Sequence, residues 1–181
     1  MGRVTIMDSK YGNEIDVINA VDYILDREKC RHHLYGSNNI LGTDLLYYPS
    51  SVARQLLVIQ RTSSISFQRR IFHIGIDFDN DLDHIAQNSV LATGYLMMGL
   101  YPDYQAVFSV HENTKNIHLH LIINNIPLYG TEPLTRHMNL LRLEEIDKAV
   151  QDACYSLMLS KELYTASYQT IYREVLSRFL R

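Results

Sequence analysis

The sequence lacks several common features, and each absence excludes some classes of fold or function. Only two cysteines occur, Cys30 and Cys154, and neither lies in a CxxC pair, so no disulfide framework or zinc ribbon is expected. No apolar run approaches the roughly 20 residues that a membrane span needs. The first residues also lack the apolar core of a signal peptide. We therefore expect a cytoplasmic protein without membrane insertion.

An excess of positive charge is also missing. The formal net charge is −3, whereas a protein that coats a DNA duplex is more basic, so any contact with nucleic acid must be local. The 181 residues show no internal repeat and no low-complexity segment. Their length and ordinary composition suit one domain with a substantial core.

A histidine-rich stretch organises the chain. Two segments of alternating polarity, 104–111 and 117–124, flank the polar residues ENTKN and predict a β-hairpin. If His111 pairs with His118, then Ser109 pairs with His120. All three imidazoles then lie on one face with Cβ spacings of about 4.5–8 Å. We predict that these three histidines bind one divalent metal, although chance alternation can also produce the pattern.

The other histidines are weaker candidates. His73, His84 and His137 each stand alone in the sequence, and most single histidines in proteins are not ligands.

Hydrophobic periodicity predicts an α+β fold. The predicted strands are 3–8, 71–79, 104–111 and 117–124, and the predicted helices are 13–28, 50–61, 81–99, 139–160 and 166–180. Residues 34–49 have scattered Gly, Asn and Pro and predict an irregular loop. The hairpin makes part of the sheet antiparallel. We expect helices to cover one face, with the histidines and Tyr23 on the other side or at the rim.

Tyr23 is the candidate nucleophile. At 100° per residue it falls nearly opposite the apolar stripe of its helix, so its hydroxyl is available, although most helical tyrosines serve in packing. A metal held by three histidines keeps its positive charge for an anionic substrate, and a tyrosine can attack a polarised phosphodiester. Its reference pKa is about 10, so it needs help to ionise. Asp77, on the less apolar side of a strand, is the first candidate for assisting the tyrosine or for holding a ligand histidine, and Glu112 is the second.

Four arginines are candidates for phosphate contacts. Arg61, Arg69 and Arg70 bracket a polar break at 62–66, and Arg27 opens the basic run REKCRHH. Surface arginines commonly have no specific partner, and a solvated loop is the slightly favoured interpretation of the basic run.

Three segments together resemble the relaxases, the mobilisation nucleases within the HUH endonucleases. His118-Leu119-His120 is the His-hydrophobe-His pair, and the string VHENTKNIHLHLIIN is similar to the third relaxase motif. NAVDYILDREK resembles the first motif, with Tyr23 at the nucleophile, and RRIFHIGIDFD resembles the second. The resemblance covers about residues 3–160.

The resemblance implies a palm-like α+β fold with a five-stranded antiparallel sheet flanked by helices. It implies a catalytic domain over residues 1–160, followed by a helical extension over 161–181. Relaxases nick one strand at an origin of transfer, hold the 5′ phosphate on tyrosine, and later rejoin the ends, in conjugative transfer or mobilisation.

The resemblance also implies partners and a cofactor. The metal is a divalent ion, Mg²⁺ or Mn²⁺ first, with others able to occupy the site. The partners are single-stranded DNA, relaxosome accessory proteins and a type IV secretion coupling protein, in the bacterial cytoplasm. We expect DNA binding to depend on Arg61, Arg69, Arg70 and the loop that Arg27 opens, and to weaken steeply with salt.

The chain departs from the family pattern at two positions. Asn113 stands where the family often has Asp, and Asp77 stands where it often has Ser. Two other interpretations stay open. A rolling-circle initiator or a transposase shares the histidines but places its tyrosine after them, as Tyr155, Tyr164, Tyr168 and Tyr172 allow. A DNA-binding protein that retains the fold without activity is the third.

Overall fold

The computed structural model describes residues 2–7, 11–30, 33–42, 44–78, 87–114 and 116–136. Five strands form a single sheet in the order β1-β3-β5-β4-β2, and every neighbouring pair is antiparallel. This confirms the α+β prediction with a five-stranded antiparallel sheet. The strands are β1 (Gly2–Ile6), β2 (Tyr35–Asn38), β3 (Ile71–Phe78), β4 (Tyr104–His111) and β5 (His118–Pro127).

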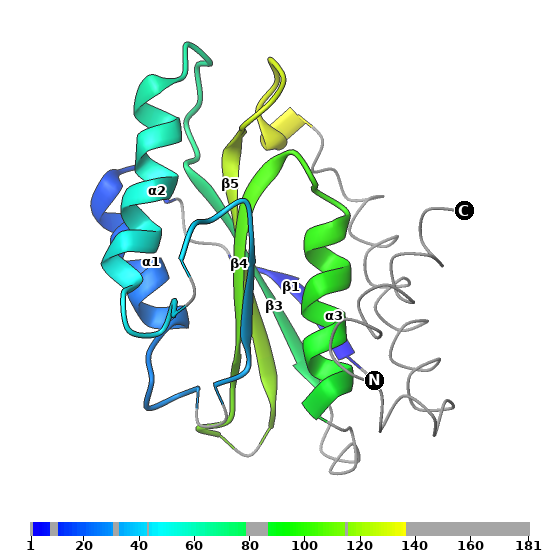
Figure 1. Ribbon diagram of the computed structural model, residues 1–181. Helices are drawn as coiled ribbons and strands as arrows, with labels where there is room; N and C mark the ends of the chain where they lie inside the picture. The colour runs from blue at the N-terminus through cyan, green and yellow to red at the C-terminus, as the bar shows by residue number, and fades with distance from the viewer. Residues whose placement is uncertain are drawn as a thin grey trace.

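Helices cover both faces of the sheet, which corrects the expectation of a single covered face. Helices α1 (Glu14–Ile24) and α2 (Pro49–Thr62) lie on one side, and α3 (Gln87–Gly99) lies on the other (Figure 1). The reason is that the central strands are apolar on both faces. Val107 and Ile122 pack with α1 and α2, whereas Phe108 and Leu121 pack with α3.

The segment 34–49 contains an edge strand that the sequence pattern did not predict. Strand β2 pairs with β4, with Gly36 opposite Phe108. A Cβ added to Gly36 would lie 2.2 Å from the Tyr95 hydroxyl oxygen and 2.6 Å from Cε1 of Phe108. Glycine is therefore present because the backbone approaches two aromatic rings closely, and glycine weakens the strand signal in a sequence.

Helix α1 begins as predicted and ends four residues early. Asn13 caps it in a reciprocal capping box with Asp16, in which the two backbone N–H groups donate to the opposite side chains at 2.9 and 3.1 Å. The helix ends at Ile24 and not at Glu28. The Glu28 N–H donates to the Asp26 carboxylate at 3.0 Å, a local bond that competes with a further helical turn.

Several predictions fall outside the described residues. These are Asp79, His84, His137, the start of the helix at 81–99, the helices at 139–160 and 166–180, and the four tyrosines after residue 150. A 3₁₀ turn, η2 (Leu134–Arg136), ends the described part. Within that part, no helix is long and apolar enough to cross a membrane.

Candidate active site

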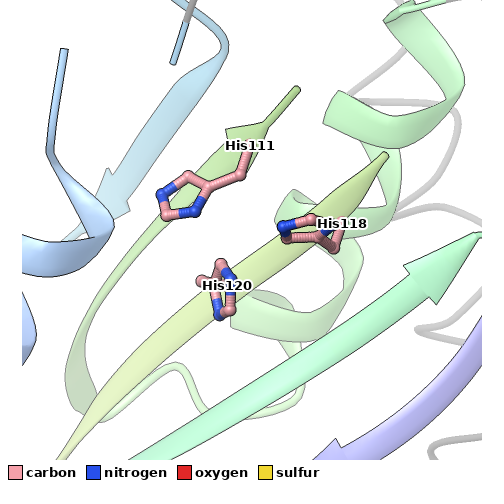
Figure 2. A group of neighbouring side chains, drawn as sticks. All are labelled: His111, His118 and His120. Carbon is pink, nitrogen blue, oxygen red and sulfur yellow. The ribbon is translucent and has the colours of Figure 1, made fainter. Parts of the chain in front are cut away.

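The β4–β5 hairpin has the predicted register. His111 is the cross-strand partner of His118, and Ser109 is the partner of His120. The three imidazoles turn toward one another from the two strands (Figure 2), and one nitrogen of each lies within 4.8 Å of the others. The structure therefore brings together all three predicted ligands.

The end of α1 orients His111. The Nε2 atom of His111 lies 2.9 Å from the Ile24 carbonyl oxygen, which can only accept, so Nε2 carries the proton and Nδ1 keeps its lone pair. The Ser109 hydroxyl donates to the same carbonyl. If α1 continued to Glu28, this carbonyl would be used inside the helix. The early helix end thus fixes the ring of a candidate ligand.

The other two candidate ligands are also held through one nitrogen. His120 Nδ1 lies 3.0 Å from His73 Nε2, and His118 Nδ1 lies 3.4 Å from the Thr114 hydroxyl. Within the described part of the chain, His111 Nδ1 and His120 Nε2 are buried without a hydrogen-bond partner. Unpaired buried polar atoms are costly. Two such atoms beside a third imidazole fit a divalent cation, which would use these lone pairs.

Burial keeps three histidines of the site neutral: His73, His111 and His120. Burial, followed by the proximity of other imidazoles, lowers the pKa of His120 to about 2. Burial and then His111 lower the pKa of His73 to about 4. Burial likewise lowers the pKa of His111. Neutral imidazole is the form that binds a metal, so burial keeps His111 and His120 in the form that a ligand needs.

Tyr23 stands beside the triad, on the last turn of α1. Its side chain is 44% exposed, which agrees with the predicted orientation away from the core. The ring centroid lies 5.4 Å from that of His111 and 5.3 Å from that of His120, both edge-on. Lys29 Nζ lies 4.0 Å from the Tyr23 ring centroid and forms an ion pair with Asp26 at 3.2 Å. A cation therefore covers one face of the candidate nucleophile.

A cavity of about 630 Å³ opens next to the tyrosine, within the range of ligand sites. Met7 packs directly over Gly75, since a Cβ there would lie 2.6 Å from the Met7 methyl group. The cavity lining combines residues of α1, β3 and β5 with two residues of the segment between β1 and α1: Met7, Tyr11, Asp16, Asn19, Ala20, Tyr23, His73 and His120.

Sequence reasoning missed three residues of this site: His73, Tyr11 and Lys29. His73 was recognised only as an isolated histidine. The feature that could have identified His73 is its position in β3, two residues before Gly75. Gly75 is the cross-strand partner of His120, so His73 and His120 lie close together on one face of the sheet. That signal needs the β3–β5 register, which sequence alone does not provide.

The two candidate helpers flank the triad on different sides. Asp77 is the cross-strand partner of His118, and its side chain is exposed. Glu112 directly follows His111, and its backbone N–H donates to the Lys29 carbonyl at 3.0 Å. Each carboxylate therefore belongs to a residue adjacent to a candidate ligand, in sequence or across the sheet.

Each of the four candidate arginines already has a partner within the chain. Arg61 forms an ion pair with Glu14, with Nε–Oε1 at 2.9 Å and Nη2–Oε2 at 2.5 Å. A phosphate must therefore compete with this carboxylate. The other contacts are Arg70 Nη1 to Gln60 Oε1 at 2.9 Å, Arg27 Nη2 to Tyr47 Oη at 2.8 Å, and the Arg69 guanidinium 4.9 Å from the Phe72 ring centroid.

An antiparallel sheet that carries a histidine triad beside an accessible tyrosine brings together groups that can bind a metal and a group that can attack a phosphodiester. The family model described as "Relaxase: MobA/VirD2-like, nuclease domain" matches residues 23–172, most of the chain. The chain therefore belongs to the relaxase family and carries its nuclease domain. The family uses a divalent metal, and the triad is the group of described residues suited to hold one. No curated protein matches the sequence.

Proposed function

We propose that the chain nicks one strand of DNA at an origin of transfer, with Tyr23 as nucleophile and the histidine triad as metal ligands. The observation that carries the proposal is the edge-on position of the Tyr23 ring against both His111 and His120. This position puts the hydroxyl-bearing ring beside the atoms that would hold a phosphate-binding ion. The cavity lined by Tyr23 and His120 provides space for the DNA strand.

The reaction is a transesterification. The Tyr23 hydroxyl oxygen forms a bond to phosphorus while the bond from phosphorus to the 3′ oxygen breaks. The tyrosine gives up its proton to a base, and the departing 3′ oxygen gains one. One phosphodiester is exchanged for another, so attack by a free 3′ hydroxyl can later reverse the step and rejoin the strand.

A divalent ion, when bound, polarises the phosphate and offsets its negative charge. The triad contributes three neutral ligands and no carboxylate, so the chain leaves the charge of the ion available to the phosphate. Mg²⁺ prefers oxygen ligands, whereas Mn²⁺ belongs to the first-row transition metals that also bind sites with nitrogen ligands, although it binds them the most weakly of the series. Of the two ions that the family resemblance suggests, the donor set supports Mn²⁺.

The surrounding side chains supply charge and proton transfer in this proposal. Lys29 stabilises negative charge on Tyr23, and Asp77 or Glu112 takes the proton or holds a ligand. The DNA backbone is contacted by four arginines: Arg27, Arg61, Arg69 and Arg70. The wider partners are accessory proteins of the relaxosome and a type IV secretion coupling protein, in the bacterial cytoplasm.

The test is covalent capture of DNA. The full chain is incubated with Mn²⁺ and tiled single-stranded oligonucleotides from the DNA around its own gene, then run on a denaturing gel. Wild type should form an adduct with one oligonucleotide, and Tyr23→Phe should form none. Tyr129→Phe is the matched control, because Tyr129 is 75% exposed and follows the opposite end of β5 from the triad.

Mass spectrometry of the adduct separates the alternatives. A phosphotyrosine at residue 23 supports the relaxase mechanism. A phosphotyrosine at residue 155, 164, 168 or 172 would reject Tyr23 and favour a rolling-circle initiator or a transposase. Binding of origin DNA without any adduct would favour a DNA-binding protein that has lost the reaction.

A further inference from the structure

A fourth histidine, His73, stands behind the triad. His73 comes from β3, and its Nε2 lies 3.0 Å from His120 Nδ1, with both rings buried. On its other side, His73 Nδ1 lies 2.7 Å from the Tyr11 hydroxyl. Three side chains therefore form a continuous chain of hydrogen bonds that ends at a candidate metal ligand.

Only one donor-to-acceptor direction of these hydrogen bonds, from His120 through His73 to Tyr11, is compatible with metal binding. A neutral imidazole has one N–H and one lone pair, so His120 can bind a metal through Nε2 only if Nδ1 carries the proton. His73 Nε2 must then accept, and its Nδ1–H must donate to the Tyr11 oxygen. In the opposite direction, His120 carries its proton on Nε2 and cannot bind the metal there.

We propose that His73, supported by Tyr11, is a positioning residue that fixes the tautomer and the ring orientation of His120. The inference rests on the proposed metal-binding role of the triad. His111 must also carry its proton on the nitrogen that does not face the metal, but there a backbone carbonyl accepts that N–H. His120 depends on a side chain, so its competence as a ligand can be removed by substitution without changing the triad.

His73 is not a fourth ligand in this arrangement. Both of its ring nitrogens are within hydrogen-bond distance of other side chains, and the cluster of converging ligand atoms contains only the triad among the described residues.

The backbone also holds Tyr11 in place. Its φ is +40°, which is uncommon for a residue with a side chain, and its carbonyl accepts from the Arg70 N–H at 2.9 Å. Tyr11 precedes the residues that the family model matches, so this end of the chain of hydrogen bonds lies outside the family match.

Two measurements on the full chain test the proposal. Two-bond ¹H–¹⁵N NMR correlations of the metal-free protein report which nitrogen of His120 carries the proton, and His120→Gln assigns the signal. Calorimetry with Zn²⁺ reports affinity, because Zn²⁺ is diamagnetic and favours imidazole. The variants are His73→Phe, His73→Gln and Tyr11→Phe. His33→Asn is the control, since it removes an exposed imidazole at φ +54°, a conformation that Asn tolerates.

We expect the Nδ1–H tautomer of His120 in wild type and the Nε2–H tautomer in His73→Phe. Zn²⁺ affinity should fall about 10- to 100-fold in His73→Phe, the usual effect of losing a partner of a metal-bound histidine. In His73→Gln the amide oxygen can replace Nε2 as acceptor, so affinity should stay within about threefold of wild type. This variant keeps the test valid if His73→Phe fails to fold. Tyr11→Phe should lose less than about tenfold.

The two proposals fail in different ways. If wild type binds Zn²⁺ and His73→Phe binds it equally well, the metal site stands and the role of His73 is overturned. An Nε2–H tautomer in wild type would also overturn it, as would a His73→Gln variant that loses as much affinity as His73→Phe. If the tautomer depends on His73 but wild type binds no Zn²⁺, the pairing stands and the metal assignment of the proposed function is wrong.

Discussion

Two clusters of buried polar side chains lie on the same face of the sheet and differ in how they are satisfied. The amide cluster comprises Gln60, Gln105 and Asn124. Its members pair with one another and with backbone: Asn124 Nδ2 donates to Gln105 Oε1 at 3.0 Å, and Gln60 Nε2 donates to Asn124 Oδ1 at 3.0 Å. The histidine cluster, His73 with the triad, leaves two buried nitrogens without partners among the described residues.

The contrast separates a structural cluster from a binding cluster. Asn124 and His118 both belong to β5 and point to the same face, six residues apart. At one end, side-chain amides complete their own hydrogen bonds and fasten α2 to the sheet. At the other end, hydrogen bonds orient the rings of His111 and His120 and leave His111 Nδ1 and His120 Nε2 without a partner among the described residues. Buried polar atoms that lack partners therefore mark the end of the sheet where a ligand belongs.

The largest expected difference between the clusters is in metal affinity. His118→Ala removes one ligand, so Mn²⁺ affinity measured by calorimetry should fall at least about 100-fold, or about 3 kcal/mol. Asn124→Ala should leave it within about threefold. EDTA should lower the melting temperature of wild type loaded with Mn²⁺ but not that of His118→Ala. Equal Mn²⁺ affinities in wild type and His118→Ala would show that the histidine cluster does not differ from the amide cluster in metal binding.

Acid should destabilise the metal-free protein through the histidine cluster. Burial lowers the pKa of His73 to about 4, whereas an unfolded histidine titrates near 6.5. Between these pH values the unfolded state binds more protons, so the free energy of unfolding falls as pH falls. The contribution of His73 is on the order of 3 kcal/mol. It is complete above pH 6.5 and is lost as pH falls toward 4.

Urea unfolding in EDTA at pH 7 and pH 4.5 measures this loss. His73→Phe, which cannot titrate, should show a smaller difference between the two pH values than wild type. The same difference in both proteins would show that His73 does not carry the effect.

The amide cluster should contribute mainly to stability. Asn124→Ala removes the partner of the buried Gln105 Oε1 atom, one of the two acceptors of Gln60 Nε2 and the bond to the Leu56 carbonyl, which together cost about 2 kcal/mol in the free energy of unfolding. Urea unfolding at pH 7 measures this change. Asn19→Ala, an exposed asparagine on α1, is the control and should stay within about 0.5 kcal/mol. If Asn124→Ala changes the free energy of unfolding no more than the control does, the amide cluster does not stabilise the packing of α2 on the sheet.

The triad was predictable from sequence because it depends on one hairpin. Residues 104–111 and 117–124 alternate cleanly around a polar turn, so the pairing of His111 with His118 follows from local pattern. His73 was not predictable as part of the site. Its contact with His120 depends on which strand lies beside β5, and the two residues are 47 positions apart.

The sequence pattern was also misleading at the end of α1. Residues up to Glu28 are compatible with a helix, and helix propensity is a weak guide against tertiary contacts. The helix ends because residues 26–28 form a turn at Asp26. The Ile24 carbonyl that this turn leaves free accepts the hydrogen bond from His111. A short-range signal cannot reveal a bond between residues 87 positions apart.

The smallest effect expected is that of the Lys29 cation over Tyr23, the proposed nucleophile. Lys29→Met keeps a long apolar side chain over the Tyr23 ring and removes the charge, so the rate of adduct formation should fall about fivefold, near 1 kcal/mol. Arg54→Met removes an equal charge from an exposed position on α2 and should leave the rate nearly unchanged. Lys29→Arg should retain most of the wild-type rate of adduct formation. If both methionine variants slow the reaction equally, and more so at low salt, the effect is general attraction of DNA. Lys29 would then have no specific role at Tyr23.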